Sequence, residues 1–283
     1  MVEQKRLGAF EKRIHEIDFI RGLLMMLVIM DHLFWFFKTY SGIIYDHNNV
    51  QFFKVCYDIF NFYWTSNIRV IIRQLALFGF VFISGISCAF SRNNWKRAAQ
   101  MILVWGALSL VTNIIHAVTR YQFNGGDIPN LSIVLDFNVI GVLAWSILIY
   151  CFFQNRSWKA LAAFGLGAFL FTIIVIPTLL SISGIEQYPM PALWRFDFSE
   201  EYLITSGGVY FYGDWLPLFP YICYFFLGAI VAKLLYKDKQ SLIPSRKEFE
   251  RPFCFVGRHA IWVYLLHEPI LMGIAALVML FVR

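Results

Sequence analysis

Ionisable residues lie within an apolar stretch near the N-terminus, where their spacing could support proton transfer. In a helix over residues 16–35, Asp18, Arg21 and His32 fall on one stripe. At 1.5 Å per residue, His32 lies roughly 16–17 Å along the helix from Arg21. A histidine at that depth suits general-base chemistry, and the neighbouring Asp31 could orient its imidazole. A purely structural interpretation is also open: Asp18 and Arg21 form an ion pair at the helix end, and His32 is a core histidine with satisfied hydrogen bonds.

A second set of polar residues lies within the apolar stretch closest to the C-terminus. His267 and Glu268 occupy its middle, and Pro269 directly after them frees a backbone carbonyl. Arg258 precedes the stretch. Ionisable groups at bilayer depth are costly and usually face a cavity or a partner, so the pair favours a functional site over packing. His267 is a candidate substrate-positioning residue or second base, and Glu268 could also hold an imidazole.

Three further positions have both a functional and a structural interpretation. Arg92, Lys96 and Arg97 could receive a phosphate-bearing ligand, although short basic loops also simply set membrane orientation. Asn138 and Asp214 lie near the outer ends of two apolar stretches. Either side chain could contact a substrate, and either could serve as a helix cap or dipole partner.

Composition places the chain among integral membrane proteins. Of its 283 residues, 59% are hydrophobic and 15% are charged, whereas a soluble domain carries about 25% charged residues. Apolar stretches of the length that crosses a ~30 Å hydrocarbon layer recur along the chain. We therefore expect an all-α membrane protein, a polytopic bundle of about seven transmembrane helices at 19–37, 71–90, 98–118, 131–153, 160–182, 215–236 and 260–282.

The distribution of basic residues predicts the orientation. With the N-terminus in the cytoplasm, 17 of the 24 Lys and Arg residues fall on the cytoplasmic side. The long segments 39–70 and 183–214 then face outward. Residues 42–66 are aromatic but broken by charged residues, which predicts an interfacial loop or surface helix rather than a crossing.

The same features exclude several classes. The basic residues adjoin apolar spans instead of forming a patch, so we expect no nucleic-acid partner. The five cysteines have no metal-ligand spacing and do not predict a disulfide framework, and we expect no metal. No removable signal peptide, internal repeat or separate soluble domain is evident. Residues 1–283 are therefore expected to form a single transmembrane domain.

Four motifs, in order along the chain, resemble the heparan-alpha-glucosaminide N-acetyltransferase catalytic-domain family, and in particular its small bacterial members. An Asp-x-x-Arg-Gly…His element is matched in the first span, and a Ser-Gly-Ile-Ser…Ser-Arg element at 84–92. An Asp-aromatic-x-Pro-Leu-x-Pro…Leu-Gly element is matched at 214–228, and a Gly-Arg…Tyr-Leu-x-His-x-Pro element at 257–269.

The resemblance implies transfer of an acetyl group from cytosolic acetyl-CoA to an amine or hydroxyl of a sugar or glycan acceptor, at or beyond the outer face. The expected site residues follow the motifs and the polar positions above. The catalytic candidates are His32, Asp31 and His267; the acetyl-CoA candidates are Arg21, Arg92, Arg97 and Arg258; the substrate candidates are Asp18, Asn138, Asp214 and Glu268. The expected partners are membrane lipids and a second copy of the chain, in a bacterial plasma membrane.

Some positions depart from the family pattern. Phe36 stands where many small members have an aspartate, and His32 where the lysosomal enzyme has an asparagine. The lysosomal enzyme's luminal histidine lies in the following loop, where this chain has His47 at a different spacing. His32 and His47 therefore remain alternative bases, and direct transfer and an acetyl-histidine intermediate remain alternative routes.

Two other functions fit the same residues. A proton-coupled transporter or flippase also needs buried ionisable groups and broken helices. The other alternative is a structural membrane subunit that binds no ligand and needs neither buried ionisable groups nor broken helices. One feature favours an acetyltransferase over a transporter: the basic residues gather at one end of a helical stripe that leads to His32. A transporter should instead spread its ionisable residues over both halves of the bundle.

Overall fold

A computed structural model describes residues 14–123, 138–175, 178, 182, 216, 218–236, 240–243 and 248–282. All regular structure in these residues is helical, as predicted. The chain divides into two compact units, Met1–Ile83 with Asp238–Arg283, and Ser84–Lys237. Helix α4 (Asn67–Phe90) runs from the first unit into the second.

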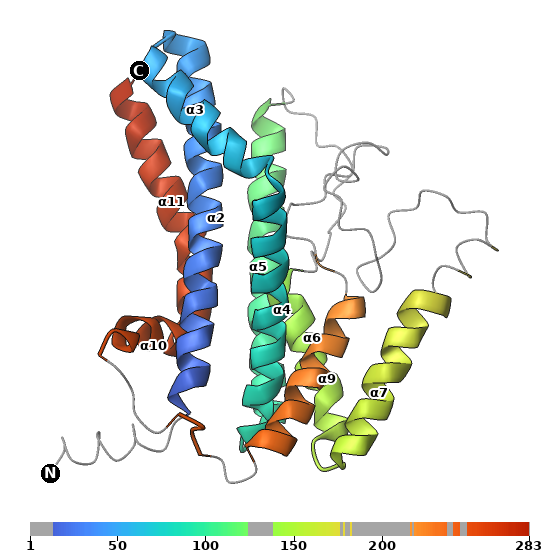
Figure 1. Cartoon of the computed structure of the whole chain (residues 1–283). Coiled ribbons are helices and arrows are strands. Elements are labelled where there is room, and N and C mark those ends of the chain that lie inside the picture. Colours follow the sequence, from blue (N-terminus) through green and yellow to red (C-terminus); the bar gives the residue numbers. More distant parts are fainter. Residues whose placement is uncertain are drawn as a thin grey trace, which may run out of the picture. The chain divides into compact units, whose positions relative to one another are not determined.

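Helix α2 (His15–Asn48) is the central element of the first unit. It contacts α3 (Gln51–Trp64), α10 (Glu250–Arg258) and α11 (Ala260–Val282). Figure 1 shows α11 running alongside α2, with α10 beside the N-terminal end of α2. The two ends of the chain therefore build one unit, in which α2 and α11 carry the candidate histidines.

Helix α2 is longer than the span predicted at 19–37. Its 34 residues extend roughly 50 Å at 1.5 Å per residue, and residues 39–48, which we expected in an outer segment, continue the helix. The helix ends where Asn49 adopts a left-handed conformation with φ of 53° and donates its backbone N–H to the Tyr45 carbonyl. Such a cap terminates a helix without proline, so hydropathy alone does not reveal where this helix stops.

Helix α3, which folds back along α2, makes up residues 51–64 of the aromatic segment, whereas residues 42–48 belong to α2. Phe60 and Tyr63 of α3 contact the ring of Phe34 on α2. The other side of α3 exposes an apolar stripe, Phe52, Val55, Ile59 and Phe62. Its placement at a membrane interface stays a prediction.

The second unit contains α5 (Asn94–Phe123), α6 (Val139–Phe153), α7 (Trp158–Leu170), the π-helix η1 (Phe171–Val175) and α9 (Leu218–Leu235). Helix α6 packs on α5 and α9, and α7 packs on α9. Aromatic rings of Tyr150, Phe153, Phe164, Phe225 and Phe226 fill the space between α6, α7 and α9.

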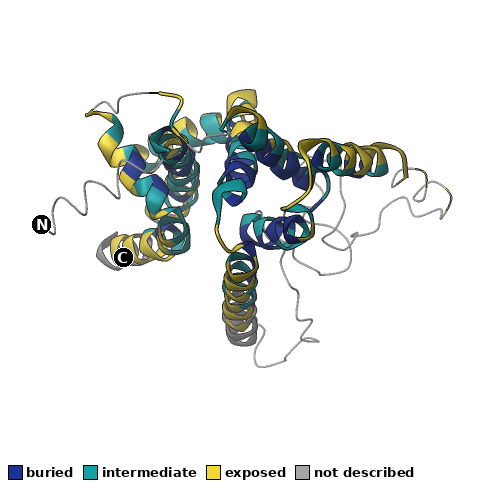
Figure 2. Ribbon diagram, turned by 90° about the horizontal axis from the view of Figure 1, so that it is seen from below, coloured by how far each residue is buried: buried dark blue, intermediate teal, exposed yellow. Residues whose placement is uncertain are grey.

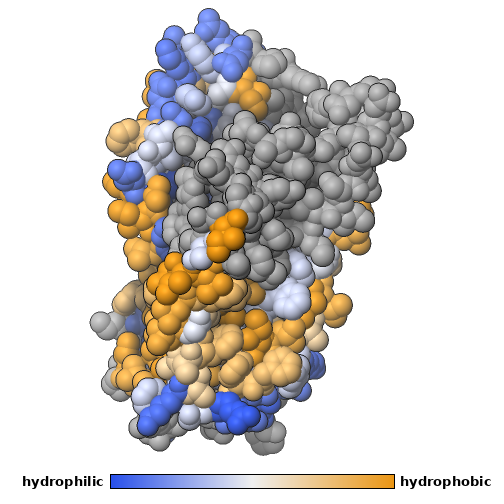
Figure 3. All heavy atoms as spheres, turned by 90° about the vertical axis from the view of Figure 1, so that its right-hand side faces the viewer, coloured by the Kyte–Doolittle hydropathy of each residue, from blue (hydrophilic) through white to orange (hydrophobic). Residues whose placement is uncertain are grey.

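Within the described residues, four helical segments are long and apolar enough to cross a membrane: His15–Asp46, Asn67–Phe90, Trp158–Val175 and Leu218–Leu235. Val139–Phe153 and Ala260–Ile274 are apolar but shorter. Figure 2 shows exposed residues on the outward sides of many helices, and many of them are large and apolar. Figure 3 shows a broad hydrophobic area with hydrophilic residues at its lower border. These features indicate an integral membrane protein, while seven spans and a cytoplasmic N-terminus stay predictions.

Candidate active site

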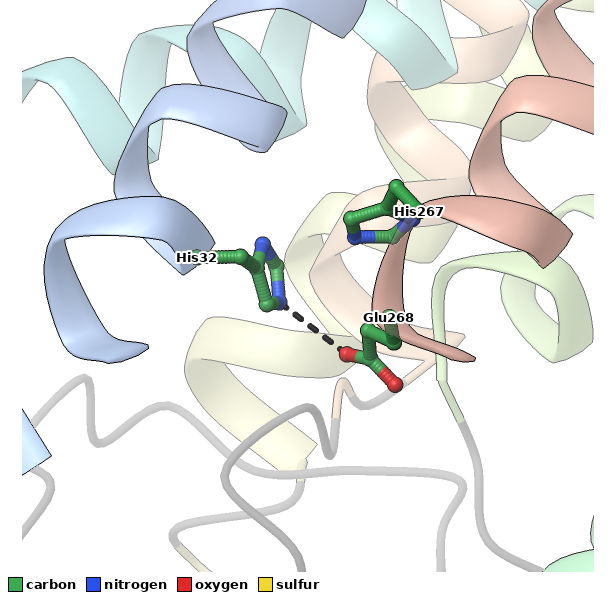
Figure 4. Close-up of side chains that lie close together, drawn as sticks. All are labelled: His32, His267 and Glu268. Atoms are coloured by element: carbon green, nitrogen blue, oxygen red, sulfur yellow. Dashed lines mark ion pairs between the residues drawn. The ribbon is translucent and has the colours of Figure 1, made fainter. Parts of the chain in front are cut away.

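Two histidines and a glutamate from the first unit gather in one place (Figure 4). His32 comes from α2, and His267 and Glu268 come from α11. The Nε2 atom of His32 lies 3.2 Å from Oε1 of Glu268. The imidazole rings of the two histidines meet edge to face, with centroids 4.8 Å apart. Residues separated by more than 230 positions therefore form one cluster.

Backbone carbonyls hold both imidazoles. Nδ1 of His32 lies 2.9 Å from the Val28 carbonyl oxygen, and Nδ1 of His267 lies 2.6 Å from the Tyr264 carbonyl oxygen. Because a carbonyl oxygen only accepts hydrogen bonds, Nδ1 must be the donor in each ring. The lone pair of a neutral ring is then on Nε2, and in His32 this atom faces Glu268.

This arrangement is chemically suited to proton transfer. A neutral imidazole and a carboxylate would both present lone pairs across 3.2 Å, so a proton shared between them stabilises the pair. The side chain of His32 is 21% exposed and that of Glu268 is 47% exposed, whereas His267 is 7% exposed. A ligand can therefore approach the pair from the Glu268 side, while His267 supports the ring of His32 from a buried position.

Asp31, expected beside the reacting histidine, is engaged elsewhere. Its carboxylate accepts hydrogen bonds from Nε and Nη2 of Arg69 at 3.0 and 3.2 Å, and from the Tyr63 hydroxyl at 3.1 Å. The guanidinium of Arg69 also lies over the ring of Trp64, 3.3 Å from its centroid. Asp31, one residue before His32, thus connects α2 with α3 and with the beginning of α4.

Tyr63 is a hydrogen-bond donor in this network at neutral pH. Burial, followed by the charge of Asp31 and the hydrogen bond to it, raises the pKa of the Tyr63 phenol to about 12. Arg69 was not predicted as a site residue. The sequence does indicate that such a residue exists, because the Asp31 carboxylate lies within an apolar helix and a charge in such surroundings needs a partner of opposite sign.

Arg21 and Arg258 adjoin the point where α2 and α10 cross. Gly22 and Gly257 bring the two backbones together: a Cβ on Gly22 would meet the Phe253 carbonyl group, with its carbon only 2.6 Å away. Nη1 of Arg21 donates to the Gly257 carbonyl oxygen at 3.3 Å and to Asp18 at 3.2 Å. The motifs Arg21-Gly22 on α2 and Gly257-Arg258 on α10 therefore face each other where the two helices cross.

The other predicted residues belong to other elements of the chain. Arg92 is exposed in the turn between α4 and α5, and Arg97 is half-buried in the first turn of α5, both in the second unit. Asn138 caps α6 by accepting the backbone N–H of Gly141 at 3.0 Å. Asp214 lies outside the described residues. His47 lies near the end of α2, roughly 22 Å along the axis from His32.

The fold and the cluster together define a helical membrane protein with a candidate proton-transfer centre between two of its helices. The sequence model for the catalytic region of heparan-alpha-glucosaminide N-acetyltransferase matches residues 13–269, and the chain belongs to that family. The resemblance drawn from the four motifs is thereby confirmed, and membership implies an acetyltransferase of membrane type. No curated protein and no solved structure matches the chain.

Proposed function

We propose that this protein transfers the acetyl group of acetyl-CoA to an amine or hydroxyl of a sugar or glycan acceptor at or beyond the outer face of a membrane. The main support for this proposal is the position of the His32 imidazole. Its Nδ1 is hydrogen-bonded to the Val28 carbonyl, its Nε2 faces Glu268, and its ring contacts that of His267. Family membership supplies the reaction type. The geometry supplies a base with a defined tautomer.

In the proposed reaction, Nε2 of His32 accepts the proton of the acceptor amine or hydroxyl as the nucleophile attacks the acetyl carbonyl carbon. The new carbon–nitrogen or carbon–oxygen bond forms, and the thioester carbon–sulfur bond breaks. The CoA thiolate leaves and takes the proton from the imidazolium. Glu268, whose Oε1 lies 3.2 Å from the same nitrogen, stabilises the positive charge of the imidazolium.

The crossing of α2 and α10 is the proposed donor end. Arg21 and Arg258 supply guanidinium groups there for the phosphates of CoA, since arginine suits bidentate phosphate recognition. Eleven residues separate Arg21 from His32, roughly 16–17 Å along α2. That length is close to half the thickness of a ~30 Å hydrocarbon layer, so an extended pantetheine arm can lead from the arginines to the histidine. Arg92 and Arg97 are further candidates for the same ligand.

The test is a direct assay of the reaction. Purified protein is incubated with acetyl-labelled CoA and a panel of amino sugars and glycan precursors, and label transfer and CoA release are measured together. We expect CoA release that depends on one class of acceptor. A protein that moves an acceptor or CoA across a bilayer but never transfers the label would instead be a transporter built on the same ionisable residues.

A further inference from the structure

The cluster of His32, His267 and Glu268 contains side chains of the kinds that bind transition metals. One ligand atom from each residue lies within 4.8 Å of the other two, and the closest pair, His32 Nε2 and Glu268 Oε1, is 3.2 Å apart. Tetrahedral coordination with bonds of about 2.0–2.2 Å places neighbouring ligand atoms roughly 3.3–3.6 Å apart. The His32–Glu268 pair is close to this spacing, and the ligand atom of His267 lies within 4.8 Å of both.

The surroundings of both histidines are those of metal ligands. A ligating histidine usually donates its other ring N–H to a carbonyl or carboxylate, which fixes the tautomer and aims the ligating nitrogen. Here Nδ1 of His32 donates to Val28 and Nδ1 of His267 donates to Tyr264. Both Nε2 atoms thus carry the lone pair that a metal needs. The sequence shows no local ligand spacing because the ligands come from opposite ends of the chain.

Charge also favours a cation at this position. Because Nδ1 of each imidazole donates to a backbone carbonyl, the Nε2 atoms and the carboxylate present acceptors to one another, and a positive charge between them is favourable. A proton meets this need for the His32–Glu268 pair alone, whereas a divalent ion meets it for all three groups. Figure 4 shows the three side chains turned toward a common space between α2 and α11.

We propose that His32, His267 and Glu268 form a binding site for a divalent transition-metal ion of the Zn²⁺ class. Imidazole and carboxylate ligands suit this class, and three protein ligands leave the fourth position open. Metal binding does not require the proposed acetyl transfer. It does occupy the nitrogen of His32 that would act as the base, so bound Zn²⁺ should inhibit transfer until a chelator removes it.

The test uses the full chain in detergent micelles, stripped of metal with a chelator and then titrated with Co²⁺ as a spectroscopic probe and Zn²⁺ as a competitor. We expect one Co²⁺ per chain, with visible absorption that Zn²⁺ abolishes. His267→Ala and Glu268→Gln should each weaken binding at least tenfold, since even outer-shell changes weaken such sites about 10–100-fold. His259→Ala is the matched control, because this exposed histidine lies outside the cluster, and its affinity should equal that of wild type.

Saturable Co²⁺ binding that is lost in both cluster variants and kept in His259→Ala supports the site. No saturable binding in wild type overturns it, as do equal affinities in all variants. Circular dichroism and gel filtration verify folding, and if His267→Ala does not fold, the nearly isosteric Glu268→Gln decides alone. Absence of acetyl transfer in the metal-free protein would count against the proposed function and not against the metal site, because binding is read from Co²⁺ absorption.

Discussion

Replacing Gly22 with alanine should open the crossing of α2 and α10 and weaken the donor end of the proposed site. The added Cβ would lie 2.6 Å from the Phe253 carbonyl carbon and 3.1 Å from the Gly257 nitrogen, whereas ordinary contact begins at 3.4 Å. The obstructing atoms are backbone, so a rotamer change cannot relieve the overlap. The two helices must separate by about 1 Å, and overpacking of this kind costs about 1–3 kcal/mol.

Gly273→Ala is the matched control, because a Cβ at Gly273 in α11 meets nothing within 4 Å. Alanine at an exposed helical position is favoured over glycine by about 0.5–1 kcal/mol, so this variant should be slightly more stable than wild type. The assay is thermal unfolding in detergent, with acetyl-CoA affinity measured on the same samples. We expect Gly22→Ala to lower both stability and affinity. Equal stability of Gly22→Ala and Gly273→Ala would refute the close approach of the two helices.

Three further predictions concern individual side chains. His32→Ala should lower acetyl transfer by about 10²–10⁴-fold, the usual contribution of a general base, and leave acetyl-CoA binding intact; a loss below about threefold, or a larger loss in His47→Ala, would remove His32 from the mechanism. Arg21→Ala should weaken acetyl-CoA binding by about 1.5–3 kcal/mol in calorimetry, the worth of a charge-assisted hydrogen bond; unchanged affinity would leave Arg21 with only its structural contacts. Arg69→Met should lower the free energy of unfolding by about 1–3 kcal/mol, because it leaves the half-buried Asp31 carboxylate without its ion-pair partner. Adding Asp31→Asn should restore part of that loss, and no recovery in the double variant would contradict the pairing.

Much of the site was predictable because its residues stand out against an apolar background. His32, His267 and Glu268 were recognisable as costly groups in apolar stretches, and their convergence needed only the packing of α11 on α2. The identity of their partners was not predictable. A carboxylate next to a histidine in sequence points to a different side of the helix, and Asp31 accordingly turns to Arg69.

Helix ends and close helix contacts were the least predictable features. The extension of α2 to Asn48 depends on one left-handed residue, Asn49, and hydropathy carries no signal for it. Gly22 and Gly257 were visible as motif residues, but only the structure gives their physical reason, which is a backbone contact that admits no side chain. Tertiary contacts of this kind leave no periodic pattern in the sequence.

The central claim is that the acetyl group crosses from a cytoplasmic donor to an acceptor on the opposite face. The most direct measurement uses sealed proteoliposomes of uniform orientation, with acetyl-labelled CoA on the side of Arg21 and Arg258 and an amino-sugar acceptor confined to the other side. We expect labelled acceptor on the far side, with all of the CoA remaining where it was added, and no labelled product with His32→Ala. Passage of intact CoA or intact acceptor through the bilayer, without chemical change in either, would contradict it.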